Sequence, residues 1–110
     1  MKNTEVVDTT SKYIVKSTGI GSETNEELVD AEELTGGTDG SKVSLIECYH
    51  LIEGTGTMTI SAGSEDLTLT GKGKYGLRPG QLKFGNDEQF TLTTDGNVTS
   101  YLLVTEFRRN

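Results

Sequence analysis

The sequence predicts a small all-β domain, and three observations carry this prediction. Short apolar runs recur between turn signals, polar and apolar residues alternate within several of the runs, and Thr occupies 17 of the 110 positions. Alternation with a period of two is typical of half-buried strands, and β-branched residues such as Thr favour strands. We therefore expect an antiparallel sandwich, jelly-roll or barrel.

The first 41 residues differ in composition from the rest of the chain. They contain eight of the 26 Leu, Ile, Val and Phe residues, and residues 23–33 carry six acidic side chains. Ser22 and the acids after it fit the cap of a short helix, but we favour a solvated, partly mobile segment. We assign residues 1–41 to an acidic, partly ordered N-terminal arm and residues 42–110 to a barrel core.

From residue 43 onward the chain predicts one strand after another. Gly71 and Gly73 break the pattern, residues 85–88 predict a turn, and Asp95-Gly96 is the strongest hairpin signal. The predicted strands span residues 43–52, 57–61, 67–70, 82–84, 89–93 and 98–107.

Charge and composition exclude several classes of protein. Seventeen acidic and ten basic residues give a net charge of −7, which would be repelled by a long nucleic acid. No apolar run approaches the length of about 18 residues that a membrane span needs, and the first residues lack the apolar stretch of a signal peptide. Cys48 is the one cysteine, so it has no internal disulfide partner. We expect a cytoplasmic protein with no membrane partner.

Residues 47–60 and 75–84 resemble the two motifs of the cupin family. In the first segment six residues separate Glu47 from Gly54, which is the family's spacing between a Glu and a hairpin Gly. The resemblance covers roughly residues 40–107. It implies a small cupin-like β-barrel in which Glu47 points inward, and a homo-oligomer, since cupins often dimerise through strand or sheet contacts and the arm would pack on a neighbouring subunit.

The histidines that bind metal in cupins are missing from this chain. The resemblance places a His-x-His pair shortly before Glu47 and a third His in a later strand, but His50 is the one histidine. Because several imidazole nitrogens must converge to hold a transition metal, we expect a metal-independent protein without a cofactor. The expected His positions are occupied by Ser41 and Val43, or Gly40 and Lys42, and later by Thr91, Gln89 or Phe90.

Glu47 is the first candidate for a ligand-binding residue. A carboxylate inside a small barrel must be hydrogen-bonded or protonated, and Tyr49 and Tyr101 are natural partners if they share the cavity. A purely structural buried acid is the alternative interpretation. Period-two alternation puts Cys48 and His50 on the opposite face of the strand, so we expect a half-buried His50 away from the site and no Cys–His nucleophile.

A basic cluster supplies further candidates. Lys72, Lys74, Arg78 and Lys83 lie within twelve positions and could bind a phosphate or carboxylate. The alternative is a solvated loop and an edge strand protected by Lys, which we favour. The complete set of candidate ligand-binding residues is Glu47, Tyr49, Lys74, Arg78, Gln89, Thr91 and Tyr101.

Three functions remain open from the sequence. The first is a sequestering or sensing protein that binds a small polar or anionic ligand without transforming it, for example a phage-encoded sponge for a nucleotide signal. The second is a metal-free isomerase, epimerase or cyclase that uses Glu47 as acid or base. The third is a structural or assembly component. We favour the first and expect no catalytic residue.

Overall fold

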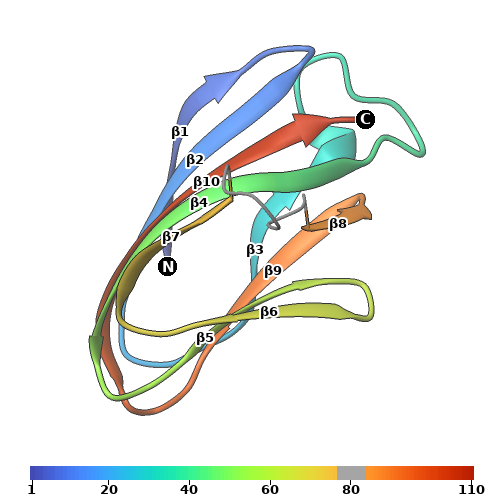
Figure 1. Cartoon of the computed structure of the whole chain (residues 1–110). Helices are drawn as coiled ribbons and strands as arrows, with labels where there is room; N and C mark the ends of the chain where they lie inside the picture. The colour runs from blue at the N-terminus through green and yellow to red at the C-terminus, as the bar shows by residue number, and fades with distance from the viewer. Residues whose placement is uncertain (77–83) are drawn as a thin grey trace.

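The chain folds into two antiparallel sheets that face each other (Figure 1). The computed structural model describes residues 1–76 and 84–110, and within them ten strands and one short 3₁₀-helix are formed. The all-β prediction is therefore confirmed. The elements are β1 Lys2–Asp8, β2 Lys12–Ile20, β3 Glu23–Asp30, η1 Ala31–Glu33, β4 Val43–Gly54, β5 Met58–Ala62, β6 Glu65–Leu69, β7 Lys72–Gly76, β8 Phe84–Asp87, β9 Gln89–Thr94 and β10 Val98–Arg109.

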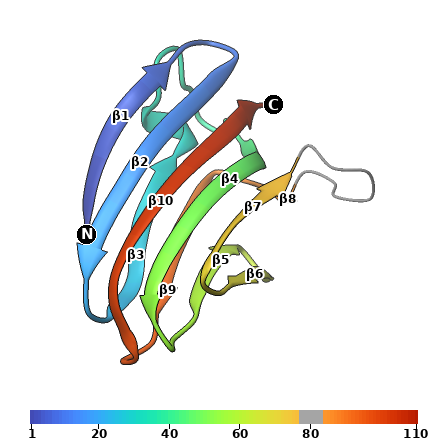
Figure 2. The ribbon, with the colours of Figure 1, turned by 60° about the vertical axis from the view of Figure 1, so that its left-hand side comes forward.

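The six-stranded sheet has the order β1-β2-β10-β4-β7, with β8 also paired to β4. The four-stranded sheet has the order β3-β9-β5-β6. Figure 2 looks onto the outer face of the larger sheet, with the smaller sheet behind it. Each strand of this sandwich presents alternate residues to the space between the sheets and to the outside.

Two of the predicted turns are strands instead. Gly73 lies in β7, where a Cβ would stand 3.1 Å from Nε2 of His50, so this glycine allows close packing and does not mark a turn. Residues 85–87 belong to β8, where Gly85 has a φ of 71° and lies against Phe90. The predicted strand 82–84 lies outside the described residues except for Phe84.

Residues 1–41 are integral to both sheets. β2 pairs along its length with β10, and β3 pairs with β9. Residues 23–30 form a strand and not a helix, and Leu28 and Val29 are buried between the sheets. Register shifts on both sides of Glu26 and Glu27 disturb the alternation that would have revealed this strand. The division at residue 41 marks a change in composition and not a structural boundary.

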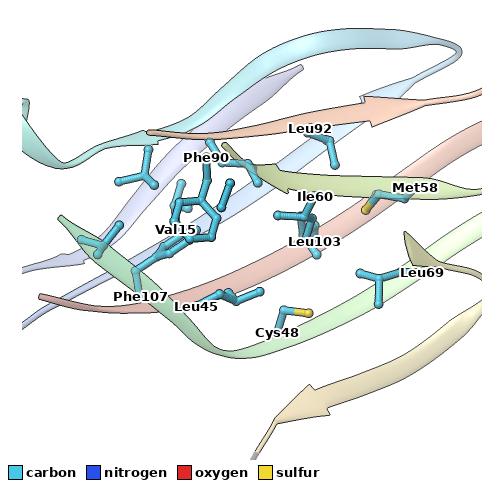
Figure 3. Close-up of a cluster of buried hydrophobic side chains, with 14 of the residues drawn as sticks. Val15, Leu45, Cys48, Met58, Ile60, Leu69, Phe90, Leu92, Leu103 and Phe107 are labelled. Atoms are coloured by element: carbon cyan, nitrogen blue, oxygen red, sulfur yellow. The ribbon is translucent and has the colours of Figure 1, made fainter. Parts of the chain in front are cut away.

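A packed apolar layer fills the middle of the sandwich (Figure 3). The rings of Phe90 in β9 and Phe107 in β10 meet edge to face with centroids 5.0 Å apart, and both side chains are fully buried. Leu45 and Leu103 lie beside them and are equally buried. This layer joins the two sheets. It occupies the interior, where the sequence analysis expected a ligand cavity.

A bulge in β4 reverses the expected direction of Glu47. Glu106 is paired with Glu47, whereas the next residue, Phe107, is paired with Leu45, so Ile46 is the extra residue of the bulge. As a result Leu45 and Cys48 both point into the core, and Glu47 lies on the outer face. The prediction that Glu47 points into the barrel is wrong.

Candidate functional site

A cleft of about 1090 Å³ opens at the end of the sandwich where β8 lies between the two sheets. In Figure 1 the elements that carry these lining residues, β8, the tip of the β5–β6 hairpin and the C-terminus, lie on the right-hand side. The described residues that line it are Ser44, Ala62, Ser64, Glu65, Asp66, Tyr75, Phe84, Gly85, Asn86, Asp87 and Asn110.

β8 forms one wall of the cleft and is anchored in the core. It pairs with β4 of the larger sheet, and the chain then continues directly into β9 of the smaller sheet. A Cβ on Gly85 would lie 2.8 Å from the Cβ of Ala62 and 2.9 Å from the ring of Phe90. The wall is therefore held so closely against the core that glycine is required at this position.

Side-chain amides connect three elements around the cleft. The Nδ2 group of Asn110 donates to the hydroxyl of Ser44 at 2.7 Å and to Oδ1 of Asn86 at 2.8 Å. Ser44 is fully buried at the start of β4. These bonds fix the amide groups relative to both β4 and β8, which preorganises this side of the cleft for hydrogen bonding.

Carboxylates also line the cleft. Oδ1 of Asp87 accepts the backbone N–H of Glu88 at 2.7 Å. Oδ2 of Asp87 faces the tip of the β5–β6 hairpin, where it would lie 2.7 Å from a Cβ added to Gly63. Asp66 accepts the hydroxyl of Ser61 at 2.7 Å. With Glu65, these side chains make every charged residue among the described lining acidic.

A second pair of acids lies beside this end of the sandwich. The Glu88 side chain hydrogen-bonds with that of Glu32, and this bond, the negative charge of Glu32 and that of Asp30 raise the pKa of Glu88. Glu32 in turn accepts the backbone N–H of Gly40 at 2.8 Å. Glu88 therefore takes up a proton more readily in the folded protein than in the unfolded chain.

Replacing Glu88 by Gln is expected to raise the melting temperature at pH 7. Because the pKa of Glu88 is raised in the folded protein, protonation of Glu88 stabilises the fold. This stabilisation is present at low pH and is lost as the pH rises through the pKa of Glu88 in the folded state. Gln at this position removes the repulsion between the two carboxylates and still donates a hydrogen bond to Glu32. Thermal unfolding followed by circular dichroism checks this, and the gain should vanish near pH 4, where Glu is ordinarily half protonated. Glu33→Gln, an exposed neighbour, is the control. An equal rise in both variants would contradict the argument.

Three of the predicted site residues lie together on the outer face of the larger sheet. Nζ of Lys74 is 2.8 Å from Oε1 of Glu47, and their side chains are 44% and 24% exposed. Tyr49 is paired with Lys74 across β4 and β7 and is 41% exposed. The structure brings these residues together, but it places them outside the sandwich and away from the residues that line the cleft.

The remaining predicted residues lie in other places. Gln89 donates to Oε1 of Glu27 at 2.9 Å on the outer face of the smaller sheet, where Thr91 also lies. Tyr101 is 4% exposed and lies over Gly19. Burial raises the pKa of Tyr101, and the nearby carboxylate of Glu23, which interacts with its hydroxyl, raises it further. Arg78 lies outside the described residues, as does Lys83.

Cys48 and His50 face the core, contrary to the expectation for His50. Nδ1 of His50 lies 3.1 Å from the carbonyl oxygen of Gly71, and since a carbonyl only accepts, Nδ1 carries the proton. Burial raises the pKa of Cys48 to about 11, so the thiol stays protonated near neutral pH. In residues 1–76 and 84–110 no three His, Cys, Asp or Glu side chains are grouped so as to hold a metal ion.

The residues that line the cleft were missed by the sequence analysis. Asn86 and Asp87 were interpreted as part of a turn. The signal that could have indicated them is the run of polar residues between Phe84, which is half-buried, and Phe90, which is fully buried. The sequence around Asn110 shows no pattern that would have indicated a site residue.

Comparisons with known proteins concern the fold. No family model matches the chain, and no curated protein matches it. Among solved structures the chain is similar to a cupin domain from Bordetella pertussis Tohama I, with 12% identity and a TM-score of 0.43 over 99% of this chain and 92% of that one. Within the described residues no helix is long and apolar enough to cross a membrane.

Proposed function

We propose that this protein binds a small polar molecule, without a metal ion, in the cleft between β4, the β5–β6 hairpin and β8. The observation that carries the proposal is the lining, which combines aromatic rings with fixed amide and carboxylate groups from both sheets. Such clefts with a few oriented polar groups are typical of small-molecule sites. A sequestering or sensing role needs no further chemistry from the protein.

The described lining favours a neutral or cationic ligand. Asp87 and Glu65 offer acceptors and negative charge, and Tyr75 and Phe84 offer aromatic rings that suit a sugar face or an organic ammonium group. A phosphate would be repelled by these carboxylates. The nucleotide-sponge alternative depended on Lys74, which is paired with Glu47 elsewhere, and on Arg78 and Lys83, which lie outside the described residues.

The enzyme alternative draws no support from the position of Glu47. Its carboxylate is paired with Lys74 on an outer sheet face, where it lacks the enclosed environment that adjusts a general acid or base. We therefore propose binding without catalysis.

A thermal-shift screen with matched probes tests this proposal. We expect glucosamine, a cationic sugar, to raise the melting temperature more than glucose does, and glucose 6-phosphate to have no effect. Asp87→Asn keeps the shape and removes the charge, so it should weaken glucosamine binding by roughly ten-fold, as expected for a hydrogen bond to a charged group. Glu47→Gln is the control and should leave binding unchanged.

A response to none of the three probes, in the presence or absence of a chelator, would contradict the proposal for this class of ligand. A response that depends on Glu47 and not on Asp87 would move the site to the outer face of the larger sheet. A response to glucose 6-phosphate alone would favour the anionic alternative.

A further inference from the structure

Two neighbouring strands carry an apolar stripe on the outer face of the six-stranded sheet. Leu102 of β10 is paired with Leu51 of β4, and two residues further along Val104 is paired with Tyr49. These four side chains point away from the core, because the residues that alternate with them in both strands are buried inside it. Figure 2 shows this face towards the viewer, with β10 and β4 at its centre and no other strand lying over them.

Lysines flank the stripe on both of its long sides. Lys16 of β2 is paired with Val104 on one side, and Lys72 of β7 is paired with Leu51 on the other. Lys74 lies two residues beyond Lys72 on the same side, and all three lysines are exposed. An apolar centre between two charged flanks is the usual composition of an interaction surface.

Lys16 and Lys72 carry charge that the chain itself does not compensate. Nζ of Lys74 lies 2.8 Å from Oε1 of Glu47, so this lysine already has a partner within its own sheet. In the part of the chain that the structure describes, no carboxylate lies within ion-pair distance of Lys16 or Lys72. The positive charges that a partner would meet are therefore those of Lys16 and Lys72.

The charge of this face differs from that of the whole protein. The chain has a net charge of −7, yet basic residues outnumber acidic ones among the described side chains that point outward from this sheet. An acidic partner is therefore attracted to this face of an otherwise acidic protein. The basic residues of the face are Lys2, Lys12, Lys16, Lys72, Lys74 and Arg108, and its acidic residues are Glu47, Glu53 and Glu106.

The two flanks are separated by the width of an α-helix. Neighbouring strands lie about 4.8 Å apart, so β2 and β7, which have β10 and β4 between them, are roughly 14 Å apart. An α-helix with its side chains measures about 10–12 Å across. A helix that lies along the stripe therefore fits between Lys16 and Lys72, and side chains on both of its flanks reach the two lysines.

We propose that this face binds an amphipathic α-helix of a partner protein, with apolar residues along its centre and acidic residues on both flanks. The apolar residues of the helix pack on Leu102, Leu51 and Val104. Its carboxylates pair with Lys16 on one flank and Lys72 on the other. This surface is separate from the cleft at the end of the sandwich, so a helix and a small ligand bind without competing.

An anionic membrane fits the same face less well. Leu51, Leu102 and Val104 are half-buried between their neighbours, so they do not protrude as residues that insert into a bilayer do. The net charge of −7 also repels an anionic bilayer as a whole. A narrow helix meets the stripe and its lysines without approaching the acidic remainder of the surface.

A designed peptide tests the proposal. The peptide has about 21 residues in three heptads, with Leu along one face, Glu at the positions that flank it, and Ala and Gln elsewhere. Fluorescence anisotropy of the labelled peptide should give a Kd below about 100 μM for the wild-type protein. A matched peptide with Lys in place of each Glu should not bind, because it meets the lysines of the face.

Four variants locate the peptide on the protein. Val104→Glu should abolish binding, since it puts a charge in the middle of the stripe. Lys16→Gln and Lys72→Gln should each weaken binding by roughly three-fold, as expected for an exposed ion pair. Thr59→Glu lowers the net charge by the same one unit on the outer face of the smaller sheet and should leave binding unchanged. Circular dichroism melts check that each variant is folded.

Several results would overturn the proposal. They are a Glu peptide that does not bind at about 200 μM protein, a Lys peptide that binds equally well, and binding that survives Val104→Glu. Cosedimentation of the protein with vesicles of phosphatidylserine, lost in Lys16→Gln, would assign the face to a membrane instead. A wild-type dimer in sedimentation velocity that Val104→Glu dissociates would assign it to a second copy. None of these outcomes depends on a ligand in the cleft.

Discussion

Replacing Phe107 by Ala is expected to lower the free energy of unfolding by about 3–5 kcal/mol. Phe107 is fully buried, stacks on Tyr13 with ring centroids 6.4 Å apart, and meets Phe90 edge to face. It is therefore a contact through which β10 of the larger sheet packs on β9 of the smaller one. Urea unfolding followed by circular dichroism measures the loss.

The neighbouring Arg108 provides a matched control. It is exposed on the same strand, so Arg108→Ala should change the free energy of unfolding by less than about 0.5 kcal/mol. A loss of less than about 1 kcal/mol for Phe107→Ala would contradict the packing of the two sheets described above.

Gly54→Ala is expected to cost about 3 kcal/mol of unfolding free energy. Gly54 has a φ of 101°, a conformation that strains any residue with a side chain, and its added Cβ would collide with the backbone carbonyl oxygen of Asn97. The collision is with backbone at the β9–β10 connection, so neither partner moves easily and the overpacking adds to the strain. Thermal and urea unfolding measure the effect.

Gly40→Ala separates the two causes. Gly40 has a φ of 84°, but nothing lies within 4 Å of its added Cβ, so it should lose only the conformational part, about 1 kcal/mol. Equal losses in the two variants would show that the close approach of Asn97 contributes nothing. The glycine of the cupin-like motif thus has a structural reason in this chain.

The strands could be predicted wherever alternation is undisturbed. Residues 57–61 and 89–93 alternate cleanly, and β5 and β9 form within one residue of the predicted ends. Asp95-Gly96 lies in the turn between β9 and β10, but β9 belongs to the smaller sheet and β10 to the larger one, so the turn is confirmed and the predicted hairpin is wrong. The pattern fails at β3 and β7, because bulges in β3 and close-packed glycines in β7 hide the period of two.

The direction of Glu47 shows the limit of such reasoning for a site. One extra residue, Ile46, exchanges the two faces of the strand after it, and nothing local in the sequence announces the bulge. The cleft is harder still to predict. Ser44, Asp87 and Asn110 come from three distant parts of the chain, and only the pairing of β4 with β8 and β10 brings them together.

The most direct measurement is a nuclear magnetic resonance titration of the uniformly ¹⁵N-labelled protein with glucosamine. If the cleft is the binding site, amide shifts should concentrate on residues 64–66, 84–87 and 110 and be lost in Asp87→Asn. Shifts confined to Glu47, Tyr49 and Lys74, and unaffected by that substitution, would contradict the account.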